Sequence, residues 1–234
     1  EVARHHAGLT RSSGNSTLGQ HSTNGSENRS KIMSHPEIFL VRHGETTWNR
    51  IGRHQGHLDS VLTLNGIAQA RGVARRLAHE IDDWTAVVIA CSPLFRCRQT
   101  AVILCDQVGV NVKHIVYDDR LKERCYGHWQ GLTDAEIIAR HPNEWAAYEA
   151  DRWSYAVPGG GENYPATSER LAAWLAEQAD DQPVVMVTHG QAGRVLRGRY
   201  LGLSPAETLA QPEPQTAAFH LAGGKARLLE GDFA

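Results

Sequence analysis

The sequence lacks the features that would place it in several common classes of protein. No apolar run approaches the roughly 20 residues that a membrane-spanning helix needs, and the first residues contain no apolar core of a secretion signal. Basic residues are not in excess, with 24 Lys and Arg against 26 Asp and Glu and a formal net charge of -2, whereas nucleic-acid-binding proteins are usually basic. We therefore expect a cytoplasmic protein whose partner is neither a membrane nor a nucleic acid.

Cysteines are few, and their spacing fits none of the common cysteine motifs. The chain has four, which are Cys91, Cys97, Cys105 and Cys125. No two of them form a Cys-x-x-Cys pair, which argues against a zinc ribbon and against a thioredoxin-like site. We expect reduced thiols, as in a cytosolic protein.

The first 35 residues differ in composition from the rest. They are rich in Ser, Thr, Asn and Gly and contain few large apolar side chains, so they cannot bury enough surface to offset the entropy of ordering. We expect residues 1–35 to be a disordered tail, with Met33 as a natural start and the residues before it as upstream translation. The chain as a whole is 41% hydrophobic and 21% charged, which is ordinary for a globular protein, and residues 36–234 are expected to form one domain.

Apolar runs alternate with segments of helical spacing along that domain. The runs at 38–41, 87–90 and 183–187 predict strands buried on both faces, and 112–116 predicts a weaker strand. Helices are expected from Thr63 onward and over 95–108, 133–141, 143–150, 167–179 and 193–201. Strands at 216–221 and 226–229 are expected to pair at the edge of the sheet. This order predicts an α/β fold, a three-layer αβα sandwich with a mostly parallel central sheet.

Three of the buried strands are followed directly by turns that carry histidine or arginine. The first leads into Arg42 and His43, the second leads to Arg96, and the third leads into His189. In an open parallel sheet, ligands bind outside the carboxyl ends of the strands, so these four side chains are expected to meet. Arginine suits the oxygens of a phosphate, and a neutral histidine can act as a nucleophile. The sequence therefore predicts a site for one phosphoryl group.

Arg42 and His43 are neighbours, so on a regular strand they would face opposite sides of the sheet. We therefore expect the strand to end there, with Gly44 supplying the freedom to turn and Thr46 or Thr47 opening a helix. This turn would bring both side chains to the same site.

With these residues, the chain resembles the histidine phosphatase superfamily, in its phosphoglycerate-mutase-like branch. The resemblance begins with the segment 39–49, which contains Arg-His-Gly-Glu-Thr. It continues in order through blocks at 55–70, 92–101, 121–131, 158–162 and 187–190. Ordered blocks over nearly all of the domain are far more specific than a lone Arg-His-Gly. The resemblance implies a phosphoglycerate-mutase-like fold.

The resemblance also implies a role for each matching residue. His43 would attack phosphorus and become phosphorylated, and Glu123 would protonate the leaving oxygen and then help to activate water. Arg42, Arg96 and His189 would bind the phosphoryl oxygens. The residues implied to line the phosphate or substrate contacts are Asn49, Gln55, Gly56 and Gly190. Neither a metal nor another cofactor is implied, because the arginines supply the positive charge.

Two other interpretations of nearby residues are weaker. His54, His57 and Asp59 have the chemistry of metal ligands, but no further matched ligand lies near them in the sequence. Cys91 and Arg96 invite comparison with the cysteine phosphatases, which need a cysteine, five residues and then an arginine. The residue after five is Cys97 in this chain, so that spacing fails.

The superfamily contains mutases as well as phosphatases, and its mutases carry a longer insertion with additional basic residues over the site. In this chain the segment 131–158 is short and has only Arg140 and Arg152 as lysine or arginine. It is dominated by aromatic residues, which are Trp145, Tyr148, Trp153 and Tyr155. A partly apolar cap favours a phosphatase for small phosphorylated metabolites over a cofactor-dependent phosphoglycerate mutase.

A catalytically silent module that binds a phosphorylated ligand is a further alternative, although every expected catalytic residue is present. The substrate stays open among sugar phosphates, phosphoglycerate derivatives, phosphoserine and cofactor-precursor phosphates. The oligomeric state is open as well, a homodimer being one arrangement.

Overall fold

The computed structural model describes residues 35–233, whose strands form a six-stranded sheet in the order β3-β2-β4-β1-β5-β6. The strands are β1 (Ile38–Arg42), β2 (Val88–Cys91), β3 (Ile115–Tyr117), β4 (Val184–Thr188), β5 (Ala217–Ala222) and β6 (Lys225–Glu230). The first four run parallel to one another, whereas β5 and β6 are antiparallel to their neighbours. Of the expected tail, only His35 lies within the described residues.

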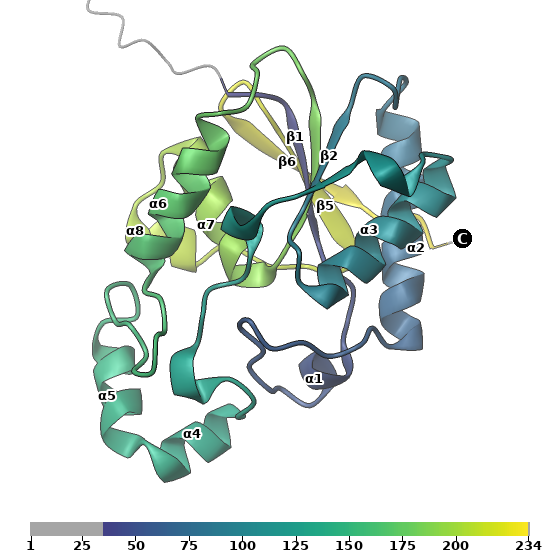
Figure 1. The fold of residues 1–234 in the computed structure, drawn as a ribbon. Coiled ribbons are helices and arrows are strands. Elements are labelled where there is room, and N and C mark those ends of the chain that lie inside the picture. Colours follow the sequence, from purple (N-terminus) through teal and green to yellow (C-terminus); the bar gives the residue numbers. More distant parts are fainter. Residues whose placement is uncertain (1–34, 234) are drawn as a thin grey trace, which may run out of the picture. The chain divides into compact units, whose positions relative to one another are not determined.

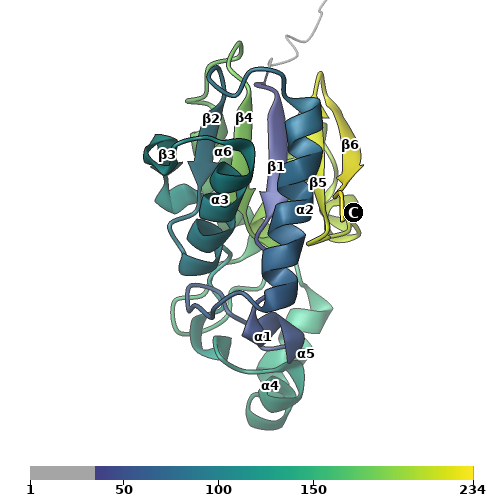
Figure 2. The ribbon, with the colours of Figure 1, turned by 90° about the vertical axis from the view of Figure 1, so that its right-hand side faces the viewer.

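Two layers of helices cover the sheet, as Figures 1 and 2 show. The helices on one face are α2 (Leu64–Glu80) and α3 (Phe95–Val108), and those on the other are α6 (Tyr164–Leu175) and α7 (Gly190–Leu201), with α8 (Pro205–Leu209) beside α7. This is the expected three-layer αβα sandwich. Within residues 35–233, no helix is both long and apolar enough to cross a bilayer.

The central strands have continuous apolar sequences because their side chains point alternately to two hydrophobic clusters, one on each face of the sheet. In β1, Phe39 and Val41 belong to the hydrophobic cluster that includes residues of α2 and α3. Ile38 and Leu40 belong to the cluster that includes residues of α6 and α7. Because side chains on a strand point alternately to its two faces, a strand covered on both faces must be apolar throughout.

The remaining short helices lie beyond the carboxyl ends of the parallel strands, which Figure 2 shows pointing toward them. They are α1 (Thr47–Arg50), α4 (Asp134–Arg140) and α5 (Pro142–Ala150). We call residues 126–158 the cap. Its core is Trp129, which is 1% exposed and whose ring lies against the rings of Trp145, Tyr148 and Tyr155. The cap therefore has a small aromatic core of its own.

Three predicted boundaries were wrong for local reasons. The segment 112–116 begins with a 3-10 turn, and β3 starts only at Ile115. Helix α6 begins at Tyr164 instead of residue 167, because the Asn163 side chain accepts a hydrogen bond from the amide of Ala166 and caps the helix. Helix α7 begins at Gly190, directly after β4 and His189. The pairing of β5 with β6 is confirmed, but only β6 is an edge strand, because β5 lies between β1 and β6.

Gly44 is needed for close packing and not for an unusual backbone angle. It is absent from the glycines that have positive φ among the described residues. A Cβ on Gly44 would lie 2.3 Å from the backbone oxygen of Gly66, and a Cβ on Gly66 would lie 2.1 Å from the backbone oxygen of Glu45. The expectation that Gly44 supplies freedom to turn is therefore replaced by a steric reason. The turn after β1 is held against the first turn of α2.

The close approach of the turn after β1 to Gly66 predicts opposite effects on stability for substitutions at two helical glycines. Gly66→Ala is expected to lower the free energy of unfolding by about 1–3 kcal/mol, because the new Cβ meets backbone that cannot easily move. Gly193→Ala in α7 is the matched control, because its Cβ would meet only side-chain carbons at 3.6 Å or more. We expect the control to be neutral or stabilising by up to about 1 kcal/mol, since alanine favours helix. Urea unfolding measures both, and equal effects would contradict the steric account.

Candidate active site

The sheet register brings the two predicted histidines together. Strands β1 and β4 are adjacent and parallel, with Arg42 opposite Thr188. The amide of His43 continues the pairing by donating to the Thr188 carbonyl at 3.0 Å. His43 and His189 therefore leave neighbouring strands side by side, and their ring centroids are 5.3 Å apart. The predicted meeting of these residues at one sheet edge is present in the structure.

Arg96 joins the two imidazoles. It lies in the first turn of α3, just after β2, and is 1% exposed. Its Nε donates to Nε2 of His43 at 3.3 Å and to Nδ1 of His189 at 3.1 Å. Both ring nitrogens must offer lone pairs to this donor, so the guanidinium is compatible only with neutral imidazoles.

The remaining hydrogen bonds fix the tautomer of each ring. Nδ1 of His43 lies 2.8 Å from the Gly44 carbonyl, which can only accept, so Nδ1 carries the proton. Nε2 of His189 lies 2.7 Å from the Ser92 hydroxyl and is the protonated nitrogen of that ring. The Nε2 lone pair of His43 is therefore exposed to the guanidinium of Arg96, in the form that a nucleophile requires.

Electrostatics favour the same neutral forms. Burial, with the Arg96 and Arg42 charges, holds the pKa of His43 well below its usual range. Burial, with the Arg96 charge, does the same to the pKa of His189. Both histidines are therefore neutral at neutral pH, which agrees with the hydrogen bonds.

Arg96 also anchors the loop 54–59, which contains the three residues considered as metal ligands in the sequence analysis. Its other nitrogens donate to the carbonyls of Gly56 and Leu58 at 2.7 and 2.8 Å and to the Asp59 carboxylate at 2.7 Å. His54 instead bonds to Asp134 at 2.6 Å, and His57 to the Glu123 carbonyl at 2.9 Å. These partners differ for each residue, so the structure gives no support to a shared metal site at His54, His57 and Asp59.

Glu123 is held with its carboxylate against the start of α7. The carboxylate accepts hydrogen bonds from the amides of Gln191, Ala192 and Arg124 at 3.1, 3.0 and 2.8 Å. These three bonds fix both carboxylate oxygens in a buried position, 8% exposed. A carboxyl group oriented in this way can deliver a proton along one direction.

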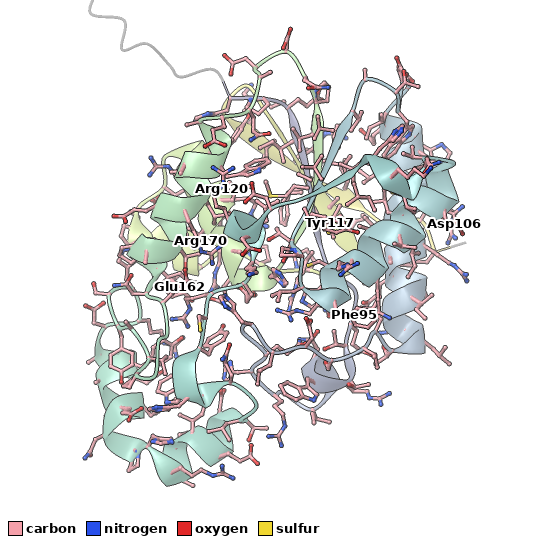
Figure 3. The ribbon with its side chains drawn as sticks, in the orientation of Figure 1. Phe95, Asp106, Tyr117, Arg120, Glu162 and Arg170 are labelled. Atoms are coloured by element: carbon pink, nitrogen blue, oxygen red, sulfur yellow. The ribbon has the colours of Figure 1, made fainter. Side chains whose placement is uncertain are left out.

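A partly buried ion pair between Arg170 and Glu162 holds the backbone of the Glu123 segment. Arg170 donates to the carbonyls of Arg120, Lys122 and Glu123 at 2.6, 2.7 and 3.1 Å. Its Nε also pairs with Glu162 at 2.8 Å. Figure 3 shows Arg120, Arg170 and Glu162 in succession along this segment. Glu162, the last residue of the matching block 158–162, therefore supports the Glu123 segment and is not among the described residues lining the cavity.

All of the predicted site residues except His189 and Gly190 line one cavity of about 230 Å³. Among the described residues, those lining it are Arg42, His43, Asn49, Gly52, Arg53, His54, Gln55, Gly56, Arg96, Glu123, Tyr126, Gln191 and Glu213. His189 and Gly190 instead line a smaller cavity directly behind, together with Arg42 and Glu213. Gly190 therefore lies behind the wall of the larger cavity. His189 acts on that cavity indirectly, through the hydrogen bond that it accepts from Arg96.

Arg42 places a second cation at the cavity beside Arg96. Arg42 donates from Nη1 to the Glu213 carbonyl, and its buried Nε has no partner among the described residues. Arg42 lines the cavity, so its guanidinium charge can attract a phosphoryl group bound there. Burial raises the pKa of the neighbouring Glu213 carboxyl, although Arg194 and Arg42 oppose that rise.

The aromatic residues expected over the site, Trp145, Tyr148, Trp153 and Tyr155, are not among the described residues lining the cavity, where Tyr126 is the one aromatic residue of the cap; this corrects the expectation of a partly apolar wall. Trp145, Tyr148 and Tyr155 pack around Trp129, and Trp153 stacks on Tyr164 at 5.3 Å. Because a buried tryptophan needs neighbours to fill its surroundings, these rings supply the core of the cap. The cavity walls are instead polar and charged.

The cysteines agree with the sequence analysis. All four lie within residues 35–233 and are free. Burial raises the pKa of the Cys91 and Cys97 thiols, so neither has the character of a reactive thiolate.

Sequence reasoning missed Asp59 as the partner of Arg96, and it missed Glu213 and Gln191 altogether. Asp59 was considered only as a metal ligand. Glu213 lies in the Pro-rich segment after α8, where no motif or periodicity marks it. Gln191 directly follows Thr-His-Gly, and its place beside a predicted site residue was the one available signal.

The two buried imidazoles make the free energy of unfolding depend on pH. Because their folded pKa lies below the value of about 6.5 for an exposed histidine, the unfolded chain binds more protons as pH falls below about 6.5, and stability is lost there. We expect up to about 1.4 kcal/mol per pH unit for each histidine. His43→Asn should reduce that slope, and the exposed His79→Asn should not. Urea unfolding from about pH 5 to 8 measures it, and identical slopes in both variants would contradict neutral burial.

Comparisons with known proteins agree with this geometry. The model of the histidine phosphatase superfamily (branch 1) matches residues 38–229. A metal-independent phosphoserine phosphatase of Arabidopsis thaliana is 34% identical over 175 residues, which cover 74% of this chain and 70% of that protein. A glucosyl-3-phosphoglycerate phosphatase of Mycolicibacterium vanbaalenii is 35% identical over 177 residues, covering 71% of this chain and 74% of that protein. The solved structure of a mycobacterial glucosyl-3-phosphoglycerate phosphatase with VO3 superposes with a TM-score of 0.66 at 30% identity, covering 85% of this chain and 99% of that one. The chain belongs to the histidine phosphatase superfamily.

Proposed function

We propose that this protein hydrolyses phosphomonoesters of small polar metabolites through a phosphohistidine intermediate on His43. The observation that carries the proposal is the hydrogen bond that Nδ1 of His43 donates to the Gly44 carbonyl, because it leaves the Nε2 lone pair of His43 facing Arg96. The relatives named as phosphatases for phosphoserine and glucosyl-3-phosphoglycerate support hydrolysis.

In the first step, Nε2 of His43 attacks phosphorus while the bond from phosphorus to the leaving oxygen breaks. Arg42 and Arg96, which both line the cavity, bind the phosphoryl oxygens and stabilise the charge of the transition state. Glu123 gives its proton to the leaving oxygen. The products of this step are the alcohol, phosphorylated His43 and the Glu123 carboxylate.

In the second step, water attacks the phosphorus of phospho-His43. Glu123 accepts the proton of that water, the phosphorus–nitrogen bond breaks, and inorganic phosphate leaves. Glu123 and His43 return to their starting states, so one water is consumed in each cycle. None of the named residues needs a metal in either step, because the arginines carry the positive charge.

The charges around the cavity support hydrolysis over phosphate transfer between positions of one substrate. A mutase for phosphoglycerates needs cations for a second anionic group. Arg53 lines the cavity, but it pairs with Glu136 at 3.0 Å. Arg152 is half exposed and pairs with Glu149 at 2.5 Å, away from the cavity-lining set. The free cysteines further support a reducing compartment such as the cytoplasm.

The nucleophile is tested by phosphate release. The wild-type chain is expected to release inorganic phosphate from phosphomonoesters in EDTA, and His43→Ala is expected to lower kcat/KM by about 10⁴-fold or more. The matched control is His79→Ala, whose exposed side chain lies on α2 and should leave kcat/KM unchanged.

Three results would redirect the proposal. Strict dependence on added metal would count against the mechanism. Isomerisation of phosphoglycerates without phosphate release would indicate a mutase, and the absence of both activities would leave a phospho-ligand-binding module.

The acid is tested by comparing two carboxyl groups that line the same cavity. Glu123→Gln is expected to lower kcat about 10²–10⁴-fold for alkyl phosphates and much less for p-nitrophenyl phosphate, whose leaving group needs no proton. Glu213→Gln should affect both substrates equally, because the Glu213 carboxylate pairs with Arg42, at 4.0 Å, and gives no proton to the leaving oxygen in this scheme. A leaving-group dependence that appears in Glu213→Gln instead would make Glu213 the acid, whose raised pKa favours its protonated form.

A further inference from the structure

The cap carries three metal-ligand side chains that the proposed hydrolysis does not use. His128 lies on the 3-10 turn Gly127–Trp129, and His141 and Glu144 lie at the start of α5. One ligand atom from each lies within 4.8 Å of the other two. Nε2 of His128 is 2.7 Å from one oxygen of Glu144, and Nδ1 of His141 is 3.6 Å from the other.

The fold presents these side chains as a group. His141 and Glu144 are three residues apart at the beginning of a helix, a spacing that places both on one face. The ring of His128 stacks on the ring of His141, with centroids 4.5 Å apart. The indole Nε1 of the buried Trp129 donates to the Glu144 carboxylate at 3.1 Å. An outer hydrogen bond of this kind orients a ligating carboxylate in metal sites.

We propose that His128, His141 and Glu144 bind one divalent transition-metal ion, with zinc as the reference ion. Two imidazoles and a carboxylate suit zinc and its neighbours, whereas magnesium and calcium prefer oxygen ligands. Ligand atoms about 2.0–2.2 Å from a tetrahedral zinc lie roughly 3.4 Å from one another. The separations from the two imidazoles to the two Glu144 oxygens, 2.7 and 3.6 Å, lie on either side of that value. All three ligand atoms lie within 4.8 Å of one another, so side-chain rotations would bring them onto one ion. Three protein ligands leave the fourth position to water.

Binding would add a coordinate link between two parts of the cap that are joined at present by ring packing and hydrogen bonds. The ion would tie the turn containing His128 to the joint between α4 and α5, where His141 ends one helix and begins the other. Zinc is therefore expected to raise the thermal stability of the chain. None of the three residues is among those lining the catalytic cavity, so this proposal does not depend on the proposed hydrolysis.

The test is a zinc titration of the full chain, purified in chelator and then freed of it, followed by calorimetry and by Trp fluorescence. The wild type is expected to bind one equivalent at this site, with a rise in Tm and a change in fluorescence from Trp129. His128→Asn and His141→Asn should each lose that equivalent. His79→Asn should retain it, and His43→Ala should retain it as well, which separates the cap from the catalytic histidines.

Two measurements keep the test independent of folding defects. Thermal unfolding in EDTA shows whether each variant is folded, and X-ray absorption of the zinc-loaded wild type needs no variant. Two imidazole nitrogens with oxygen ligands are expected in that spectrum. The proposal is overturned if zinc raises Tm equally in wild type and His141→Asn, if zinc binding is lost in His43→Ala and kept in His128→Asn, or if the wild type binds no zinc.

Discussion

One buried guanidinium organises this site. Arg96 is surrounded by two imidazoles, two carbonyls and one carboxylate, and a buried charge is tolerated only when such partners accept its hydrogen bonds. This requirement has a chemical consequence. The imidazoles can accept from Arg96 only while they are neutral, so the contacts that make the buried charge tolerable also keep His43 ready to attack phosphorus. The same side chain fixes the loop that carries Gly56 and Asp59, and thereby shapes the rim of the cavity.

The parts of this site that follow from the sequence are those set by strand ends. His43, Arg96 and His189 could be placed together because each follows a buried parallel strand, and parallel strands share a carboxyl edge. Asp59 and Glu213 could not, because each reaches the site from a loop whose path depends on packing elsewhere in the chain. Gly44 shows a third case, in which the residue was noticed but the reason was wrong. Its backbone is ordinary, and only the approach of Gly66 explains why a side chain is excluded.

The cap shows why composition is a poor guide to the wall of a cavity. Its aromatic residues were expected over the substrate, yet they surround Trp129, because a short segment beyond the sheet edge must build its own core to be ordered. Arg124 joins that core to the main domain, with its guanidinium 4.6 Å from the ring centroids of both Tyr126 and Tyr164. The surface left for substrate is formed by Arg53, Gln191 and their polar neighbours, which favours a leaving group rich in hydrogen-bonding atoms.

The central claim is that phosphorus is bonded for a time to Nε2 of His43. The most direct measurement is a rapid quench in alkali during turnover of a substrate radiolabelled at phosphorus, followed by peptide mapping of the protein. The account predicts a label on His43 that is stable to alkali and lost in acid, and that appears before inorganic phosphate accumulates. Steady phosphate release with no label on His43 at any quench time would indicate direct attack by water and would contradict it.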